Sequence, residues 1–176
     1  MNNFIQALDM SIKTKNWYSV LFISLTLPDI CGKIDDPNKG SKARTIHWYN
    51  KYLKHAYTRN IGVNREDRVF LTGSDFYALR CAYLHEGSGD ITSQNARDVL
   101  RDFVFVQNTS GPGGFHCNQI NSTLLLSVEH FGKDVMAAVN AWLEDIKEYP
   151  EKISKINGLL EIKMISPGEG FAIKLM

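Results

Sequence analysis

The sequence predicts a mainly α-helical domain that carries a small antiparallel β element and ends in a β-hairpin. Apolar residues recur at helical spacing over the first hundred residues and again beyond about residue 128. Between these stretches, residues 103–127 are rich in β-branched, aromatic and glycine residues, which is typical of short strands and turns. With 176 residues, 44% of them hydrophobic, the chain is long enough for one domain with a sizeable core.

The helical part is expected to form a bundle around one central helix. Residues 3–13 place Phe4, Leu8 and Ile12 on one face, and the segment 17–31 is apolar nearly all round, as expected for the centre of a bundle. The helices of the bundle are expected over residues 3–13, 17–31, 41–59, 74–86, 93–100 and from about 128 onward.

The β part is expected in two places. Residues 103–106, 115–118 and 123–128 read as short strands around a glycine-rich turn, and the two apolar runs that flank 167–170 predict a hairpin. We therefore expect a single domain over residues 1–176. Its parts are a helical bundle (1–102 and 128–156), a β insertion (about 103–127) and a C-terminal hairpin (about 159–175).

Composition excludes several classes of protein. The net charge is +1, so no overall electrostatic field favours nucleic acid. Three cysteines, widely spaced and without a CxxC pair, argue against a disulfide framework and a zinc site. The apolar run at 17–27 is too short to span a bilayer, and no signal peptide is expected. We expect a cytoplasmic protein without cofactor, metal or membrane partner.

The candidate catalytic residues, Arg80 and His85, lie near the end of the helix predicted over 74–86. Ser74 is placed to cap this helix, and Gly87 supplies the left-handed residue that commonly ends one. On an ideal helix Arg80 and His85 are about 140° apart in angle and about 7.5 Å apart along the axis. Arginine stabilises phosphate charge and histidine transfers protons near neutral pH, a pairing suited to RNA cleavage without metal.

Arg80 and His85, with the aliphatic and aromatic residues between them, resemble the Arg-x(4–6)-His motif of the HEPN superfamily. Further likeness to uncharacterised bacterial and phage HEPN-like proteins covers roughly residues 16–147, through the segments 27–32, 77–81 and 84–87 and Trp48. The resemblance implies a HEPN-like helical bundle and a metal-independent endoribonuclease, in a toxin or phage-defence setting. Cys81 departs from the polar residue that often follows the arginine in that family.

Three further residues are candidates for a supporting role. Asp29 lies in an apolar setting where a carboxylate needs a partner, so it is expected either to orient Arg80 or His85 or to make a structural ion pair. Tyr83 is expected in the core with its hydroxyl at the edge of the site, and Glu86 in solvent beside His85. His116 and Cys117 are adjacent on a predicted strand, and the structural interpretation is favoured for both.

Two functions remain open. The first is RNA cleavage, in which His85 moves a proton and Arg80 stabilises the phosphate charge. The alternative is a non-catalytic homodimeric interaction module of the same fold, which Cys81 and the neutral net charge favour. RNA, a second copy of the chain, and a protein partner or antitoxin are the expected partners. The pattern Arg44, Trp48, Lys51 and Lys54 is typical of an RNA-contacting helix, but an ordinary half-exposed helix is favoured.

Overall fold

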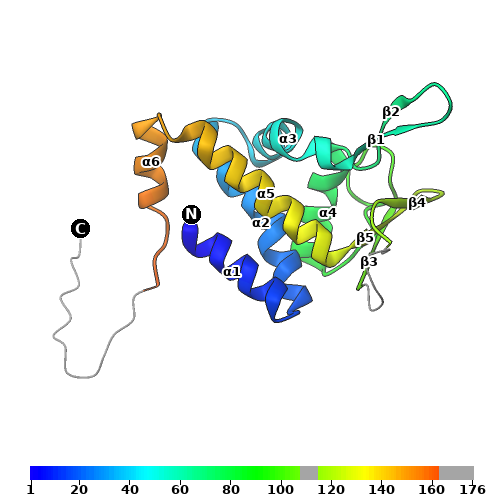
Figure 1. Ribbon diagram of the computed structural model, residues 1–176, viewed down its shortest axis with the longest axis horizontal. Helices are drawn as coiled ribbons and strands as arrows, with labels where there is room; N and C mark the ends of the chain where they lie inside the picture. The colour runs from blue at the N-terminus through cyan, green and yellow to red at the C-terminus, as the bar shows by residue number, and fades with distance from the viewer. Residues whose placement is uncertain (108–114, 163–176) are drawn as a thin grey trace.

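A computed structural model describes residues 1–107 and 115–162 of the chain and confirms the predicted mainly α-helical fold (Figure 1). The helices are α1 (Asn2–Lys13), α2 (Trp17–Asp35), α3 (Ser41–Tyr52), α4 (Gly73–Glu86), α5 (Val128–Ile146) and α6 (Pro150–Asn157), with a short 3-10 helix, η1 (Lys54–Tyr57). The strands are β1 (Thr58–Ile61), β2 (Glu66–Val69), β3 (Asp102–Val106), β4 (Asn118–Ile120) and β5 (Thr123–Ser127).

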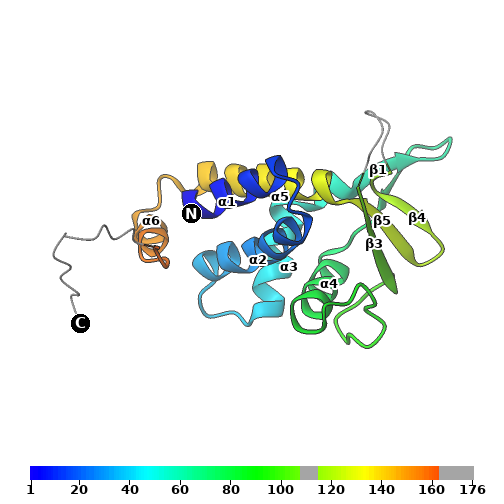
Figure 2. The same cartoon turned by 90° about the horizontal axis from the view of Figure 1, so that it is seen from below.

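Helix α2 is the centre of the bundle, as its apolar sequence predicts. It packs against α1 and α5 on one side and against α3 and α4 on the other (Figure 2). The strands lie at one end of the bundle and α6 at the other. The helix continues through Pro28 to Asp35, so the proline does not end it. Within the described residues, no helix is both long and apolar enough to cross a membrane.

A glycine lets α2 and α3 approach closely enough to share polar contacts. A Cβ atom built on Gly32 would lie 2.8 Å from the backbone oxygen of Arg44, closer than side chains tolerate. The absence of a side chain at Gly32 therefore brings the last turns of α2 against the first turns of α3. This approach places Asp29, one turn before Gly32, beside the start of α3.

Helix α4 begins and ends with recognisable caps, although the N-cap is not the predicted one. Thr72, rather than Ser74, occupies the N-cap position, and its hydroxyl oxygen accepts the Asp75 backbone N–H at 3.1 Å. Gly87 has a φ of 68° and ends the helix in the left-handed conformation, as predicted. The last turn therefore contains His85, as expected from the sequence.

The helix predicted over residues 93–100 is absent, because a buried carboxylate binds its backbone. Asp75 is fully buried and accepts the N–H groups of Asp98, Val99 and Leu100 at 2.7, 3.3 and 3.4 Å. Residues 92–101 follow an irregular path of turns and bends over the start of α4. The interaction is long-range, so periodicity within the segment does not reveal it.

The predicted β insertion forms a mixed sheet, so the antiparallel expectation is wrong for one strand. The strand order is β3-β5-β4, with β4 antiparallel to β5 and β3 parallel to β5. A tight turn at Asn121 and Ser122 pairs β4 with β5, which leaves only the far edge of β5 for β3. The inner face of this sheet joins the core of the bundle through Phe103, Leu124 and Leu126.

A second, two-stranded sheet was not predicted. Strands β1 and β2 form an antiparallel hairpin in the segment 58–69 that projects from the body of the molecule (Figure 1). Six of its eight strand residues are exposed, so the segment has no buried alternating pattern from which a strand could be predicted. The predicted C-terminal hairpin (about 159–175) lies mainly outside the described residues, and residues 159–162 contain no strand.

Candidate functional site

Arg80 points from α4 toward α2, where Asp29 binds its guanidinium. An Arg80 guanidinium nitrogen (Nη2) donates to Asp29 Oδ2 at 2.9 Å. The Arg80 side chain is 16% exposed, and its Nε is buried without a hydrogen-bond partner. Of the alternatives expected for Asp29, the structure shows an ion pair, and one of its partners is Arg80. This pair ties α2 to α4 across 51 positions of the sequence.

Asp29 also binds three side chains from the start of α3. Its Oδ1 accepts hydrogen bonds from Ser41 Oγ at 3.0 Å, Arg44 Nε at 2.7 Å and Thr45 Oγ1 at 3.0 Å. These donors occupy positions i, i+3 and i+4 of one helix, which share a face. One carboxylate thus joins three helices. We call Asp29, Ser41, Arg44, Thr45 and Arg80 the Asp29 cluster.

The Asp29 cluster is largely shielded from water and carries a net positive charge. The Asp29 and Arg44 side chains are 13% and 17% exposed. Burial alone would raise the pKa of the Asp29 carboxyl, but hydrogen bonds from Arg44, Ser41 and Thr45 and the charge of Arg80 outweigh it, so the pKa lies below its usual value. The carboxylate is therefore ionised at neutral pH, and two guanidinium groups share one negative charge.

His85 lies apart from the Asp29 cluster. It is exposed in the last turn of α4, and within the described part of the chain no hydrogen bond or ion pair connects it to Arg80 or Asp29. The angular separation expected on an ideal helix is the physical reason, because Arg80 turns inward to α2 while His85 faces solvent. One protomer therefore does not bring the two motif residues together.

The two other candidate residues have different surroundings. Tyr83 is half-buried and packs on Phe22 of α2, with ring centroids 5.2 Å apart, and its buried hydroxyl has no hydrogen-bond partner in the described part of the chain. Burial, with a smaller contribution from Tyr18, raises the pKa of Tyr83. Glu86 is exposed and accepts a hydrogen bond from Gln94 Nε2 at 3.1 Å. Neither residue contacts the Asp29 cluster among the interactions of residues 1–107 and 115–162.

Sequence reasoning missed three members of the Asp29 cluster: Ser41, Arg44 and Thr45. The sequence pattern places Arg44 on a half-exposed or RNA-contacting helix, whereas its guanidinium is directed at Asp29. The i, i+3, i+4 spacing of three donors was available as a signal. It becomes informative only once α3 is known to pack beside Asp29.

His116 belongs to a second polar cluster at the start of α5. Its Nδ1 accepts the Ser127 backbone N–H at 3.2 Å, and its Nε2 lies 3.3 Å from Asp134 Oδ2. The ring stacks on His130 at 5.2 Å between centroids, and the Ser127 hydroxyl caps α5 by accepting the His130 N–H. These contacts support the structural interpretation of His116.

Cys117 follows His116 in a left-handed backbone conformation, with φ of 60°. It is buried, and burial raises the pKa of its thiol, which opposes formation of a nucleophilic thiolate. Among the residues that the structure describes, no group of three or more His, Cys, Asp or Glu side chains is placed to hold a metal ion.

Comparison with known proteins adds no relative: no family model, no curated protein and no solved structure matches this chain.

Proposed function

We propose that this protein is a homodimeric interaction module of HEPN-like fold that pairs through one face of α2 and α4. The observation that carries the proposal is the exposure of two aromatic side chains on α2, Tyr18 (74%) and Phe22 (50%). They lie one turn apart on the same stripe, and Phe22 contacts Tyr83 of α4. We call Tyr18, Phe22, Ile23, Ile30 and Tyr83 the pairing face.

The pairing face is hollowed as well as apolar. A groove of about 210 Å³ runs beside Phe22 and is lined by Phe4, Phe22, Ile23, Thr26, Leu27 and Ile30. Aromatic side chains are enriched at the centres of protein interfaces, where they bury large areas at small entropic cost. A groove next to a projecting phenylalanine offers both a knob and a hole. That is what a surface needs in order to pack against a copy of itself.

The charge pattern favours a second copy as the occupant. In a two-fold symmetric dimer the same patch meets itself, so any charge in its centre faces a like charge. The segment 17–28 of α2 contains no charged residue. A partner of opposite charge has nothing to recognise there, whereas a second copy meets no repulsion. A stable interface of this kind buries roughly 800 Å² on each partner.

In this proposal the Asp29 cluster is structural. It fixes the angle between α2, α3 and α4, and thereby the shape of the pairing face, which α2 and α4 provide. The pairing of Arg80 with Asp29 supports this role, since the guanidinium that RNA cleavage would require already has a carboxylate partner. Three free cysteines suit the expected reducing, cytoplasmic setting.

RNA cleavage is the second candidate, and the exposure of His85 favours it. An exposed imidazole in the last turn of a helix is free to exchange protons with a ribose 2′-hydroxyl. Because one protomer supplies a single such group, the second proton-transfer group would come from the partner's copy of α4. RNA and an antitoxin-like protein are the partners that this candidate implies.

Light scattering coupled to size exclusion at micromolar concentration tests the pairing. We expect twice the monomer mass of 19.9 kDa for the wild type and the monomer mass for Phe22→Glu. Ile120→Glu is the matched control, because it places the same charge on a 62% exposed isoleucine of β4, outside the pairing face. A monomeric wild type, or equal dissociation by both variants, contradicts the proposal.

Incubation of the same samples with mixed RNA in EDTA separates the two candidates. A non-catalytic module leaves the RNA intact. Cleavage by the wild type that His85→Ala abolishes, with unchanged thermal stability, would instead establish the second candidate. Since His85 is exposed and has no bonding partner within the described residues, its replacement should change stability by less than about 1 kcal/mol.

A further inference from the structure

The β1–β2 hairpin places two arginines directly opposite each other. In its antiparallel register Arg59 pairs with Arg68, so both side chains stand on the same face of the hairpin. Like charges at directly opposed positions destabilise a strand pair. Both residues are exposed, so neither side chain offsets this destabilisation by packing in the core. Folding alone therefore gives no reason for this pair.

Among the described residues, no carboxylate pairs with either arginine. Arg68 donates to the neutral side-chain oxygen of Gln119 at 3.0 Å and lies over the ring of Phe70 at 4.9 Å. Arg59 donates to the backbone oxygen of Thr58 at 3.0 Å. Within residues 1–107 and 115–162 neither guanidinium forms an ion pair, in contrast to Arg44 and Arg80 in the Asp29 cluster. The contacts of Arg68 orient its guanidinium and leave its charge uncompensated.

The positive charge extends along the neighbouring chain. Residues 51–68 contain five Lys or Arg and two Asp or Glu, a net charge of +3, while the whole chain carries +1. The remainder of the molecule is therefore negative by two charges. Lys51 is paired with Asp145, and Asp67 bonds Asn60 on the opposite face of the hairpin. Arg65 at the turn adds a further positive charge, whereas Lys54 of η1 lines a hollow with Asn60 and Asp67 of that opposite face.

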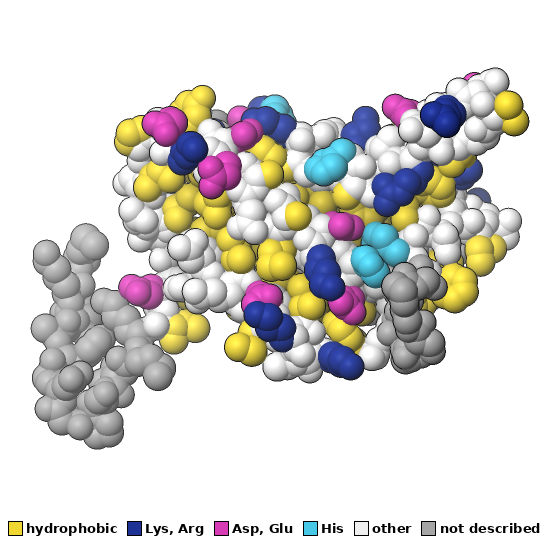
Figure 3. All heavy atoms as spheres, viewed as in Figure 1, with side chains coloured by type: hydrophobic (Ala, Val, Ile, Leu, Met, Phe, Trp, Pro, Cys, Tyr) yellow, Lys and Arg dark blue, Asp and Glu magenta, His cyan; other side chains and the backbone are white. Residues whose placement is uncertain are grey.

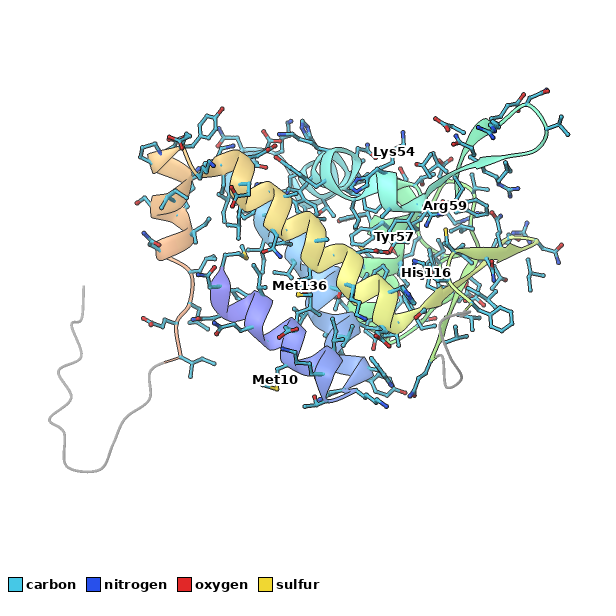
Figure 4. The ribbon with its side chains drawn as sticks, viewed as in Figure 1. Met10, Lys54, Tyr57, Arg59, His116 and Met136 are labelled. Atoms are coloured by element: carbon cyan, nitrogen blue, oxygen red, sulfur yellow. The ribbon has the colours of Figure 1, made fainter. Side chains whose placement is uncertain are left out.

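The basic side chains of this segment are exposed. At the upper right of Figure 3, dark-blue basic side chains lie on the projecting hairpin and at its base, with magenta acidic side chains on the same arm. In Figure 4 Arg59 lies where the hairpin joins the body of the molecule. We call Arg59, Arg65 and Arg68 the hairpin surface. It lies at the end of the molecule opposite α6 and does not overlap the residues of the pairing face.

We propose that the hairpin surface binds the phosphate backbone of a nucleic acid strand. Two guanidinium groups on one strand pair, each with several free donors, match a phosphodiester by charge and by geometry. Arg65 at the turn continues the contact along a chain of phosphates, which a single small anion would not need. Bound phosphate also removes the like-charge penalty of the arginine pair. The inference needs neither dimer formation nor RNA cleavage.

Fluorescence anisotropy with a labelled 20-nucleotide RNA, titrated over a series of salt concentrations, tests the proposal. We expect wild-type binding that weakens with salt, and at least tenfold weaker binding for Arg59→Gln/Arg68→Gln. Each lost phosphate contact should reduce the salt slope by about 0.7 for a single strand, so the double variant should lose about 1.4. Lys33→Gln/Lys147→Gln removes the same charge at the other end of the molecule and should bind like the wild type.

Thermal unfolding of the same variants tests whether weaker binding results from a less stable fold. Because Arg59 and Arg68 repel each other, the double variant should melt at the wild-type temperature or above it. Arg65→Gln, at the turn and outside the strand register, should weaken binding severalfold without a change in melting temperature. Absence of wild-type binding, an equal loss in the lysine control, or full competition by inorganic triphosphate at the same phosphate concentration would overturn the proposal.

Discussion

Replacement of Asp29 by asparagine should destabilise the protein strongly, although the two side chains have nearly the same shape. The substitution removes one negative charge and leaves Arg44 and Arg80 beside each other without a counterion. It also removes the ionised acceptor of the two hydroxyl donors, Ser41 and Thr45. The effect measures how much of the contact among α2, α3 and α4 depends on this single carboxylate.

The magnitude follows from the burial of the cluster. Removing one partner of a buried ion pair costs about 3–5 kcal/mol, mostly because the other charge is left uncompensated. Asparagine keeps one oxygen acceptor, and water reaches the 13% of the Asp29 side chain that is exposed, so the lower end of this range applies. We expect a loss of about 3 kcal/mol, which for a chain of this length lowers the melting temperature by about 6–12 °C.

Urea unfolding at pH 7 measures the loss, and Asp36→Asn is the matched control. Asp36 is paired with Lys39 on the surface at 3.0 Å, and its replacement should cost less than about 1 kcal/mol. The double variant Asp29→Asn/Arg80→Met should recover part of the loss, because it removes one of the two uncompensated charges. A loss below about 1 kcal/mol for Asp29→Asn, or simple additivity with Arg80→Met, would refute the central role of Asp29.

Three further predictions concern the same helices. The lowered pKa of Asp29 means that its contribution is complete above the unfolded-state pKa of about 3.9 and is lost as pH falls through the folded-state pKa. The wild type should thus lose more stability than Asp29→Asn between pH 5 and pH 2 in urea titrations, and parallel curves would contradict this. Tyr83→Phe deletes a buried hydroxyl that has no partner, so unfolding should show no loss of stability, or a gain of up to about 1 kcal/mol. Gly32→Ala introduces a methyl group 2.8 Å from the Arg44 oxygen and should cost about 1–3 kcal/mol by thermal melting; a neutral effect would mean that α2 and α3 can separate freely.

The elements predicted correctly are those whose signal is local. The pattern of apolar residues predicts helices α1 and α2, and Gly87 predicts the end of α4. The errors arise where a distant residue decides the local structure. Asp75 binds the backbone of residues 98–100 and prevents the helix expected there. In the sheet, β4 pairs with one edge of β5, so β3 can pair only with the other edge.

For the candidate site the sequence predicts partners better than it predicts geometry. An aspartate in the apolar setting of Asp29 requires a positive partner, and this reasoning led to Arg80. It could not show that α3 supplies a second arginine, because the approach of α2 and α3 depends on packing at Gly32. The separation of Arg80 from His85 follows directly from helical geometry, which sets the two side chains about 140° apart.

That separation links the oligomeric state to catalysis. With Arg80 directed at α2 and His85 at solvent, one protomer presents an acid or a base but not both. Cleavage of a phosphodiester is easiest with two proton-transfer groups, so RNA cleavage through His85 requires a second α4 nearby, and the pairing face is the surface that would bring it there. The Phe22→Glu monomer should consequently lose any such cleavage while it still binds nucleic acid through the hairpin surface, because Arg59 and Arg68 need no partner subunit. A monomeric variant that cleaves RNA at the wild-type rate would contradict the need for a second His85 and would remove the dimer from the function.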